Sequence, residues 1–147
     1  GHVALYAKDP ARMTDFYSDL FELTISARDK SDRITFMGID PRSNHHDLSF
    51  CSNPGASHIA FYVDTLEEFR GFHQELRRRK IPIFNCQMVI LGLRMDFPDP
   101  EGNIAEVVWL HGKCGKFPFF EKVDLDKMTD EEIYEIVDSM PLDERFN

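Results

Sequence analysis

The stretch HVALYA at residues 2–7 decides the fold, because it recurs later in the chain as HIAFYV at residues 58–63. Both stretches are rich in β-branched and aromatic residues, which suit a pleated strand. A second pair of related stretches follows in the same order, with DPRSN at residues 40–44 and DPEGN at residues 99–103. We therefore interpret the chain as two copies of one structural unit, which together fill residues 1 to about 110.

A helix follows the first strand of each unit. Asp9 and Pro10 suit the cap and the first turn of the first helix. The repeat continues through both helices, because Phe16 and Phe72 are 56 positions apart in the sequence, as His2 and His58 are. We expect apolar residues at helical spacing to form the buried faces, namely Met13, Phe16, Tyr17 and Leu20 in the first helix and Leu66, Phe69, Phe72 and Leu76 in the second.

Three further strand-like stretches complete each unit, which gives the order β-α-β-β-β. The pattern predicts an α+β fold in which two βαβββ modules set their sheets side by side as a half-open β cup, with the helices outside. The predicted strands span residues 23–27, 34–38 and 47–51 in the first module and residues 81–86, 91–97 and 104–110 in the second.

The domain organisation follows from the repeat. We assign residues 1–53 to the first module, 54–111 to the second and 112–147 to a C-terminal tail. In the tail, Thr129 and Glu132 form a capping box ahead of an apolar run that a proline ends, which predicts one short amphipathic helix. We expect this helix to pack on the cup or on a second chain, and a lid over a site is the alternative.

The composition excludes several classes of partner. The chain has 147 residues, of which 42% are hydrophobic, and a formal net charge of −9. This charge is a poor match to a polyanion, so nucleic acid is not an expected partner. No apolar run approaches the roughly 20 residues that span a bilayer, and no secretory signal is visible. The spacing of Cys51, Cys86 and Cys114 fits neither a disulfide framework nor a zinc site, so we expect inert thiols in a cytoplasmic protein.

Three residues could bind a metal ion together. If a pseudo-twofold axis relates the two repeats, His2 and His58 begin equivalent strands and meet near that axis. Glu106 lies on the last strand of the second module. Two histidines and one carboxylate can bind one face of a divalent metal ion and leave open positions, as in non-haem Fe(II) oxygenases. The spacing alone leaves open that the histidines are ordinary hydrogen-bonded residues and that Glu106 faces water.

The same residues resemble the vicinal oxygen chelate superfamily, which includes extradiol ring-cleaving dioxygenases, glyoxalases, fosfomycin-resistance thiol transferases and bleomycin-binding proteins. GHVAL at residues 1–5 resembles the family's opening, and SHIAF at residues 57–61 resembles its second-module strand. DPEGN at residues 99–103, followed by Glu106, resembles the family's closing Asp-Pro-x-Gly-Asn-x-x-Glu and is the most specific of the three. The resemblance implies that the two histidines and Glu106 are the metal ligands.

Within the superfamily, NHHDLSF at residues 44–50 resembles the extradiol dioxygenases. This resemblance implies that His46 is a catalytic residue, which lies beside the O₂ position and moves a proton during ring cleavage. A histidine that titrates near neutral pH is suited to that role. The alternative is that His45 and His46 form a solvated turn.

The resemblance to the dioxygenases is incomplete. Gln87 and Asp96 stand where those enzymes place a second histidine and a tyrosine near the substrate. Either the substrate differs, or the tail supplies replacements, for which Tyr134 and His111 are the obvious candidates.

The sequence thus predicts a metal-dependent, extradiol-dioxygenase-like oxidoreductase that acts on a small aromatic, catechol-like or enediol-like substrate. The resemblance implies that the substrate chelates Fe(II) or Mn(II) through two vicinal oxygens and that O₂ takes a remaining position. Zn(II) and Ni(II) are the other candidate metals. A homodimer is a further expectation, because paired modules can swap between chains.

Two alternative functions stay open. A glyoxalase-type isomerase or a fosfomycin-type thiol transferase would need a metal ion but no O₂. In the isomerases a fourth ligand comes from the first module, where Asp47 aligns with Glu106 but is one methylene shorter. A metal-free protein that sequesters a small molecule, like the bleomycin-resistance proteins, would need no ligands at these positions.

Overall fold

The two repeated stretches form strands, as their composition predicts. They are β1 (Val3–Tyr6) and β5 (His58–Val63), and the alanine that they share in the repeat, Ala4 or Ala60, is buried in both. The two strands pair antiparallel, with Ala4 opposite His58. The repeat therefore places its own two copies side by side.

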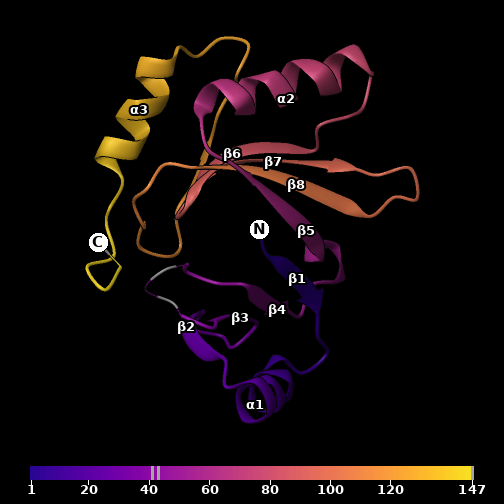
Figure 1. Cartoon of the computed structure of the whole chain (residues 1–147), viewed down its shortest axis with the longest axis vertical. Helices are drawn as coiled ribbons and strands as arrows, with labels where there is room; N and C mark the ends of the chain where they lie inside the picture. Colours follow the sequence, from indigo (N-terminus) through magenta and orange to yellow (C-terminus); the bar gives the residue numbers. More distant parts are fainter. Residues whose placement is uncertain (41, 43, 147) are drawn as a thin grey trace. The chain divides into compact units, whose positions relative to one another are not determined.

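The chain divides into two compact units, Gly1–Ile59 and Ala60–Asn147. The computed structural model describes residues 1–40, 42 and 44–146, and Figure 1 traces the elements along it. β5 begins at the end of the first unit and continues into the second. In the first unit, β1 is followed by α1 (Pro10–Phe21), β2 (Thr24–Arg28), β3 (Ile34–Gly38), β4 (Leu48–Cys51) and a short 3-10 helix, η1 (Pro54–Ala56).

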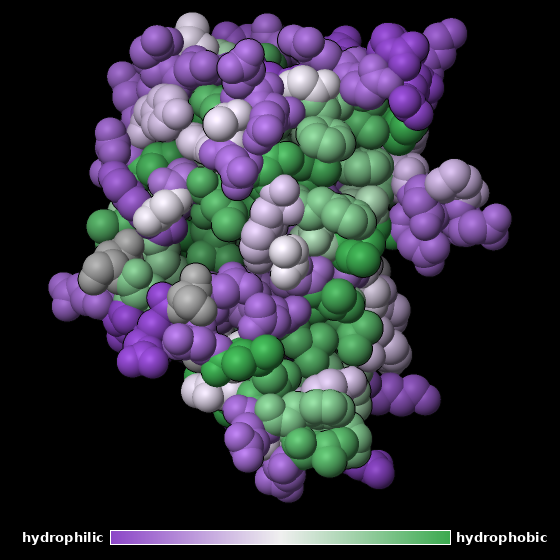
Figure 2. Space-filling view, viewed as in Figure 1, coloured by the Kyte–Doolittle hydropathy of each residue, from purple (hydrophilic) through white to green (hydrophobic). Residues whose placement is uncertain are grey.

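The α1 helix begins as predicted, but only half of its predicted apolar face is buried, since Met13 and Tyr17 pack against the core of the first unit. Asp9 caps it by accepting a hydrogen bond from a first-turn amide (3.0 Å), and Pro10 opens the first turn. Phe16 and Leu20 are 54% and 62% exposed, so their expected burial is wrong. Thr14 is buried instead, because its hydroxyl donates to the Pro10 carbonyl oxygen (2.7 Å) and is thereby satisfied without water. Figure 2 shows hydrophobic surface over the region that α1 occupies in Figure 1.

The second unit repeats the same order and then extends it. The predicted strand at residues 81–86 begins only at Asn85, because Pro82 has no N–H to donate to a sheet ladder. The elements that follow β5 are α2 (Leu66–Arg78), β6 (Asn85–Val89), β7 (Gly92–Pro98), β8 (Ile104–Leu110), β9 (Phe120–Lys122) and α3 (Asp130–Ser139).

The strands follow one hydrogen-bonded order, β2-β3-β4-β1-β5-β8-β7-β6-β9. β9, in the tail, is a strand that the sequence pattern does not predict. Its three residues are all exposed, so it shows no alternation of buried and exposed side chains. The mixed α+β class and the βαβββ order in both halves are confirmed. In the part of the chain that the structure describes, no helix is both long enough and apolar enough to cross a membrane.

The main apolar core belongs to the second unit. From α2 it receives Leu66, Phe69 and Leu76 as predicted, whereas Phe72 points to the surface. The tail helix α3 contributes to the same core, so it packs on its own unit, which is one of the two placements expected for it. Its buried residues are Ile133, Ile136 and Val137.

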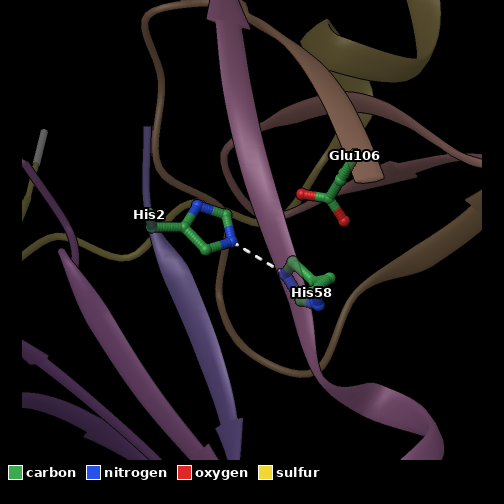
Figure 3. A group of neighbouring side chains, drawn as sticks. All are labelled: His2, His58 and Glu106. Carbon is green, nitrogen blue, oxygen red and sulfur yellow. Dashed lines mark hydrogen bonds between the residues drawn. The ribbon is translucent and has the colours of Figure 1, made fainter. Parts of the chain in front are cut away.

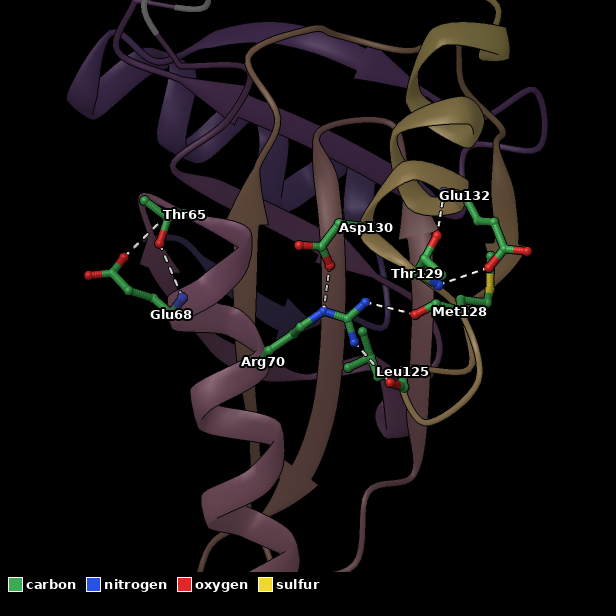
Figure 4. A network of polar contacts seen from close by, with 8 residues as sticks. All are labelled: Thr65, Glu68, Arg70, Leu125, Met128, Thr129, Asp130 and Glu132. Atoms are coloured by element: carbon green, nitrogen blue, oxygen red, sulfur yellow. Dashed lines mark hydrogen bonds and ion pairs between the residues drawn. The ribbon is translucent and has the colours of Figure 1, made fainter.

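A polar contact fixes the tail to α2. Thr129 and Glu132 form the predicted capping box at the start of α3. Figure 4 shows that Arg70 of α2 binds the first residue of this helix and the segment before it with all three nitrogens of its guanidinium group. These nitrogens donate to Asp130 Oδ1 (2.7 Å), the Leu125 carbonyl oxygen (2.9 Å) and the Met128 carbonyl oxygen (2.8 Å).

Candidate functional site

His2 and His58 meet at the junction of β1 and β5. Their Nε2 atoms lie 3.0 Å apart, and the planes of the two rings are nearly perpendicular (Figure 3). Both residues precede or open a strand of the repeat, and the antiparallel pairing of those strands brings them together. The meeting of the two histidines that the repeat predicts is therefore present within the first unit.

The hydrogen bonding of His58 settles which of its nitrogens is a donor. Its Nδ1 lies 2.8 Å from the carbonyl oxygen of Ala56 in η1. A carbonyl oxygen only accepts, so Nδ1 carries a hydrogen, and Nε2 of His58 faces Nε2 of His2. Histidines that bind metal ions commonly have this arrangement, in which a backbone carbonyl fixes the tautomer and the ring orientation.

The distance between the two Nε2 atoms also suits a metal ion. Two nitrogens that each lie about 2.1 Å from one ion, at right angles to each other, are about 3.0 Å apart. The pair of His2 and His58 therefore matches two adjacent corners of an octahedral site, the geometry on which a 2-His-1-carboxylate triad is built.

His46 lies next to this pair inside the first unit. Its ring centroid is 4.3 Å from that of His2, and its Nδ1 is 2.9 Å from Nδ1 of His45. Both His45 and His46 are buried, so the alternative of a solvated turn is wrong. Burial, with smaller contributions from His2, His45 and His58, holds the pKa of His46 well below its usual value. The ring is therefore neutral at neutral pH, with one nitrogen that donates and one that accepts.

Asp47 is engaged elsewhere in the first unit. Its Oδ2 accepts a hydrogen bond from the Ile39 amide (3.0 Å), and its Oδ1 accepts one from Asn44 Nδ2 (2.8 Å). Both oxygens thus hold the loop that leads into β4. The fourth ligand that an isomerase would need receives no support from this residue.

Glu106 lies on β8 in the second unit, where its side chain is only 2% exposed. Glu106 therefore does not face water, and the alternative that it does is wrong. Arg94 Nη1 on β7 donates to Glu106 Oε2 (2.9 Å), and Asp96 stands directly opposite Glu106 in the β7–β8 ladder. Burial raises the pKa of Glu106 to about 8; the charge of Arg94 lowers that pKa and the charge of Asp96 raises it.

Strand alternation decides which other residues share the face of Glu106. Asp96 lies opposite Glu106, and Gln87 lies opposite Arg94 on β6, so both substituted positions line the same face of the sheet. His111 follows the opposite alternation, and with Tyr134 it packs on Trp109, which belongs to the buried core under α2 and α3. The tail therefore does not supply His111 and Tyr134 as replacement substrate contacts.

The cysteines are inert, as expected. Burial raises the pKa of Cys86 to about 12 and the pKa of Cys114 to about 11, and Cys51 is buried. All three are free thiols. A thiol that ionises only at such pH values is not an activated nucleophile.

The stability of the protein is expected to fall on acidification because of His111. Burial lowers the pKa of this residue to about 4, and its Nδ1 already accepts a hydrogen bond from the Lys113 amide (3.2 Å). The unfolded chain, with a histidine pKa near 6.5, binds more protons between pH 6.5 and pH 4, so the native state loses about 2 kcal/mol across that window. His111→Gln should remove this part of the loss.

The measurement for His111 is the free energy of unfolding by urea at pH 7.5 and at pH 4.5. His73→Gln is the comparison variant: burial also lowers the pKa of His73, but the shift is smaller than that of His111, so this variant should remove a smaller part of the loss. An equal loss of stability in the wild type and in His111→Gln would contradict the assignment to His111.

Solved structures share this fold at low sequence identity. A catechol 2,3-dioxygenase is 23% identical, with a TM-score of 0.60 and a match that covers 74% of this chain and 39% of that one. Homoprotocatechuate 2,3-dioxygenase from Brevibacterium fuscum, in complex with 3,4-dihydroxyphenylacetate, is 20% identical, with a TM-score of 0.64 over 75% of this chain and 35% of that one. The chain thus spans less than two fifths of the length of these dioxygenases.

A third structure shares the fold under a different name. A chain described as NAD-dependent benzaldehyde dehydrogenase from Legionella pneumophila is 17% identical, with a TM-score of 0.51, and the match covers 74% of this chain and 96% of that one. One fold carries many activities, so these likenesses establish the architecture alone.

Sequence comparison gives the family. No curated protein sequence matches the chain. A family model, described as the Glyoxalase/Bleomycin resistance protein/Dioxygenase superfamily, matches residues 1–107. The matched region holds both repeats, both histidines of the pair and Glu106. The chain therefore belongs to the Glyoxalase/Bleomycin resistance protein/Dioxygenase superfamily.

Proposed function

We propose that the chain is a metal-dependent oxidoreductase of the extradiol-dioxygenase type, in which His2, His58 and Glu106 bind one divalent metal ion. Fe(II) is the first candidate, followed by Mn(II), with Zn(II) and Ni(II) as the others. The observation that carries the proposal is the state of His58, whose Nδ1–H is held by a carbonyl while its Nε2 faces His2 at 3.0 Å. All three residues lie in the region that the family model matches, which supports the proposal.

The chemistry of the donors fits a metal ion of this class. Neutral imidazole suits iron, zinc and nickel, and a carboxylate completes the set of two histidines and one carboxylate that leaves open positions. When bound, such an ion would polarise two adjacent oxygens of a chelating substrate as a Lewis acid. Because His46 is neutral and touches the histidine pair, it is the residue of this chain that we propose holds and moves the proton.

A catechol-like compound is the proposed substrate class. Two of the structurally similar proteins are named as 2,3-dioxygenases, and one of them is recorded with 3,4-dihydroxyphenylacetate. Both names refer to a ring that carries two vicinal oxygens. The exact compound is expected to differ, because Gln87, Arg94 and Asp96 line the face beside Glu106.

Two measurements on one preparation test the proposal. The protein is purified with oxygen excluded, its metal content is determined by elemental analysis, and O₂ uptake is then followed with an oxygen electrode across a panel of catechols. We expect close to one iron per chain and an O₂ uptake that requires both the catechol and the metal. Removal of the metal with a chelator should abolish uptake, and addition of Fe(II) should restore it.

The same experiment separates the alternatives. The thiol transferase or isomerase is favoured by one observation, namely that Gln87 and Asp96 replace the histidine and tyrosine of the dioxygenases. Its signature would be bound manganese, zinc or nickel together with no O₂ uptake. A protein that takes up no metal, even on reconstitution, would contradict both metal-dependent functions and leave a sequestering protein.

A further inference from the structure

Glu106 is held by a neighbour that the sequence pattern does not single out. Arg94 lies on β7, on the same face as Glu106, and its Nη1 donates to Glu106 Oε2 (2.9 Å). We propose that Arg94 is a positioning residue for the metal site, which fixes the carboxylate of Glu106 in the orientation that binds the ion. This inference rests on the proposed function, since it assumes that Glu106 is a ligand.

The contact with Arg94 limits how the side chain of Glu106 can turn. Oε2 accepts the bond from Nη1 of Arg94, which lies on the neighbouring strand. A charge-assisted bond to a carboxylate is short and directional, and the side chain of Arg94 is itself only 23% exposed. The carboxylate of Glu106 is therefore fixed before any ion binds, which reduces the entropy lost on binding.

Arg94 lies beside two acidic side chains. Asp96 stands directly across the ladder from Glu106 and forms a hydrogen bond with it. Arg94 approaches both groups, with 2.9 Å from Nη1 to Glu106 Oε2 and 3.6 Å from Nη2 to Asp96 Oδ2. The contact with Arg94 therefore restricts the orientation of the Glu106 side chain.

Unsatisfied polar atoms distinguish this cluster from a scaffold contact. Arg94 Nε and Asp96 Oδ1 are buried and have no hydrogen-bond partner among the residues that the structure describes. A buried polar atom that stays unpaired destabilises the folded state, unless a water molecule or a ligand satisfies it. A donor and an acceptor of this kind beside Glu106 are expected where a substrate binds.

Arg70 provides the contrast within the same unit. Its side chain is 24% exposed, close to the value for Arg94, but each of its three guanidinium nitrogens donates to an oxygen of the tail (Figure 4). Arg70 is thus an arginine with a purely structural role. The two residues form a matched pair for experiment, because burial and charge are alike while the groups they hold differ.

The test measures the affinity of the metal-free chain for Mn(II) by calorimetric titration, and separately the free energy of unfolding without metal. We expect Arg94→Met to weaken Mn(II) binding about 10–100-fold, the range found for residues that orient ligands. Arg94→Lys, which keeps the charge and one donor, should recover part of the affinity. Arg70→Met should lower the unfolding free energy and leave the Mn(II) affinity within about twofold of the wild type, since it loses only scaffold contacts.

The outcomes separate the two proposals. If neither the wild type nor Glu106→Gln binds Mn(II), the proposed function fails. If the wild type binds, Glu106→Gln does not, and Arg94→Met binds as the wild type does, the positioning role of Arg94 is overturned while the metal site stands. A loss of unfolding free energy in Arg94→Met without a loss of affinity would likewise assign Arg94 a structural role only.

Discussion

Replacing His58 with alanine is expected to abolish the binding of one equivalent of Mn(II) or Fe(II). The substitution removes one of the two proposed nitrogen ligands, namely the one whose ring is oriented by the Ala56 carbonyl. The loss should exceed the roughly 100-fold effect typical of residues outside the ligand shell. Elemental analysis of the anaerobically prepared variant, with calorimetric titration of its metal-free form, measures the effect.

The control for His58→Ala is His73→Ala. His73 lies half-buried on α2, and the charged groups that affect its pKa belong to α2 and to the tail. This variant should bind metal as the wild type does. Retention of full metal content in His58→Ala would contradict the ligand assignment, provided that circular dichroism shows a folded protein.

The second large effect is expected in the tail. Ile133 of α3 is completely buried in the core of the second unit, so Ile133→Ala removes packed methylene groups and leaves a cavity. Such substitutions lower the free energy of unfolding by about 2–5 kcal/mol. Urea denaturation followed by tryptophan fluorescence is a suitable measurement, since Trp109 belongs to the same core.

Ile39→Ala is the matched control for Ile133→Ala, because it deletes the same atoms from a side chain that is 77% exposed. Its effect should lie within about 0.5 kcal/mol, as for most surface substitutions. Equal effects of the two variants would show that α3 does not contribute to the core as described.

The internal repeat is the reason that half of the site could be predicted. HVALYA and HIAFYV each begin with a histidine and each continue into an equivalent strand. The antiparallel pairing of those strands brings the Nε2 atoms of His2 and His58 to 3.0 Å from each other. The helix caps could also be predicted from the sequence. The side chains of Asp9 and Thr129 each accept a hydrogen bond from a backbone N–H in the first turn of the helix that follows.

Other features depend on information that a linear pattern does not hold. Thr14 on α1 is buried with its hydroxyl hydrogen-bonded to the Pro10 carbonyl oxygen. A search for apolar residues at helical spacing does not find a buried threonine of this kind. The role of Arg94 depends on the register between β7 and β8, which places it beside Glu106 although twelve positions separate them. The register between two strands depends on the whole sheet, so the spacing of residues along the sequence does not predict which residues lie beside each other.

The two duplicated halves differ in the apolar core that each of them buries, and this difference bears on how often each half opens locally. The buried core of the first unit consists of Ala7, Met37 and Phe50, whereas the second unit buries residues of three strands and two helices together. Free energy of local opening follows the apolar area that a segment buries. We therefore expect the backbone amides of β1 to exchange with solvent faster than those of β7 and β8, because the second unit has the larger buried apolar core.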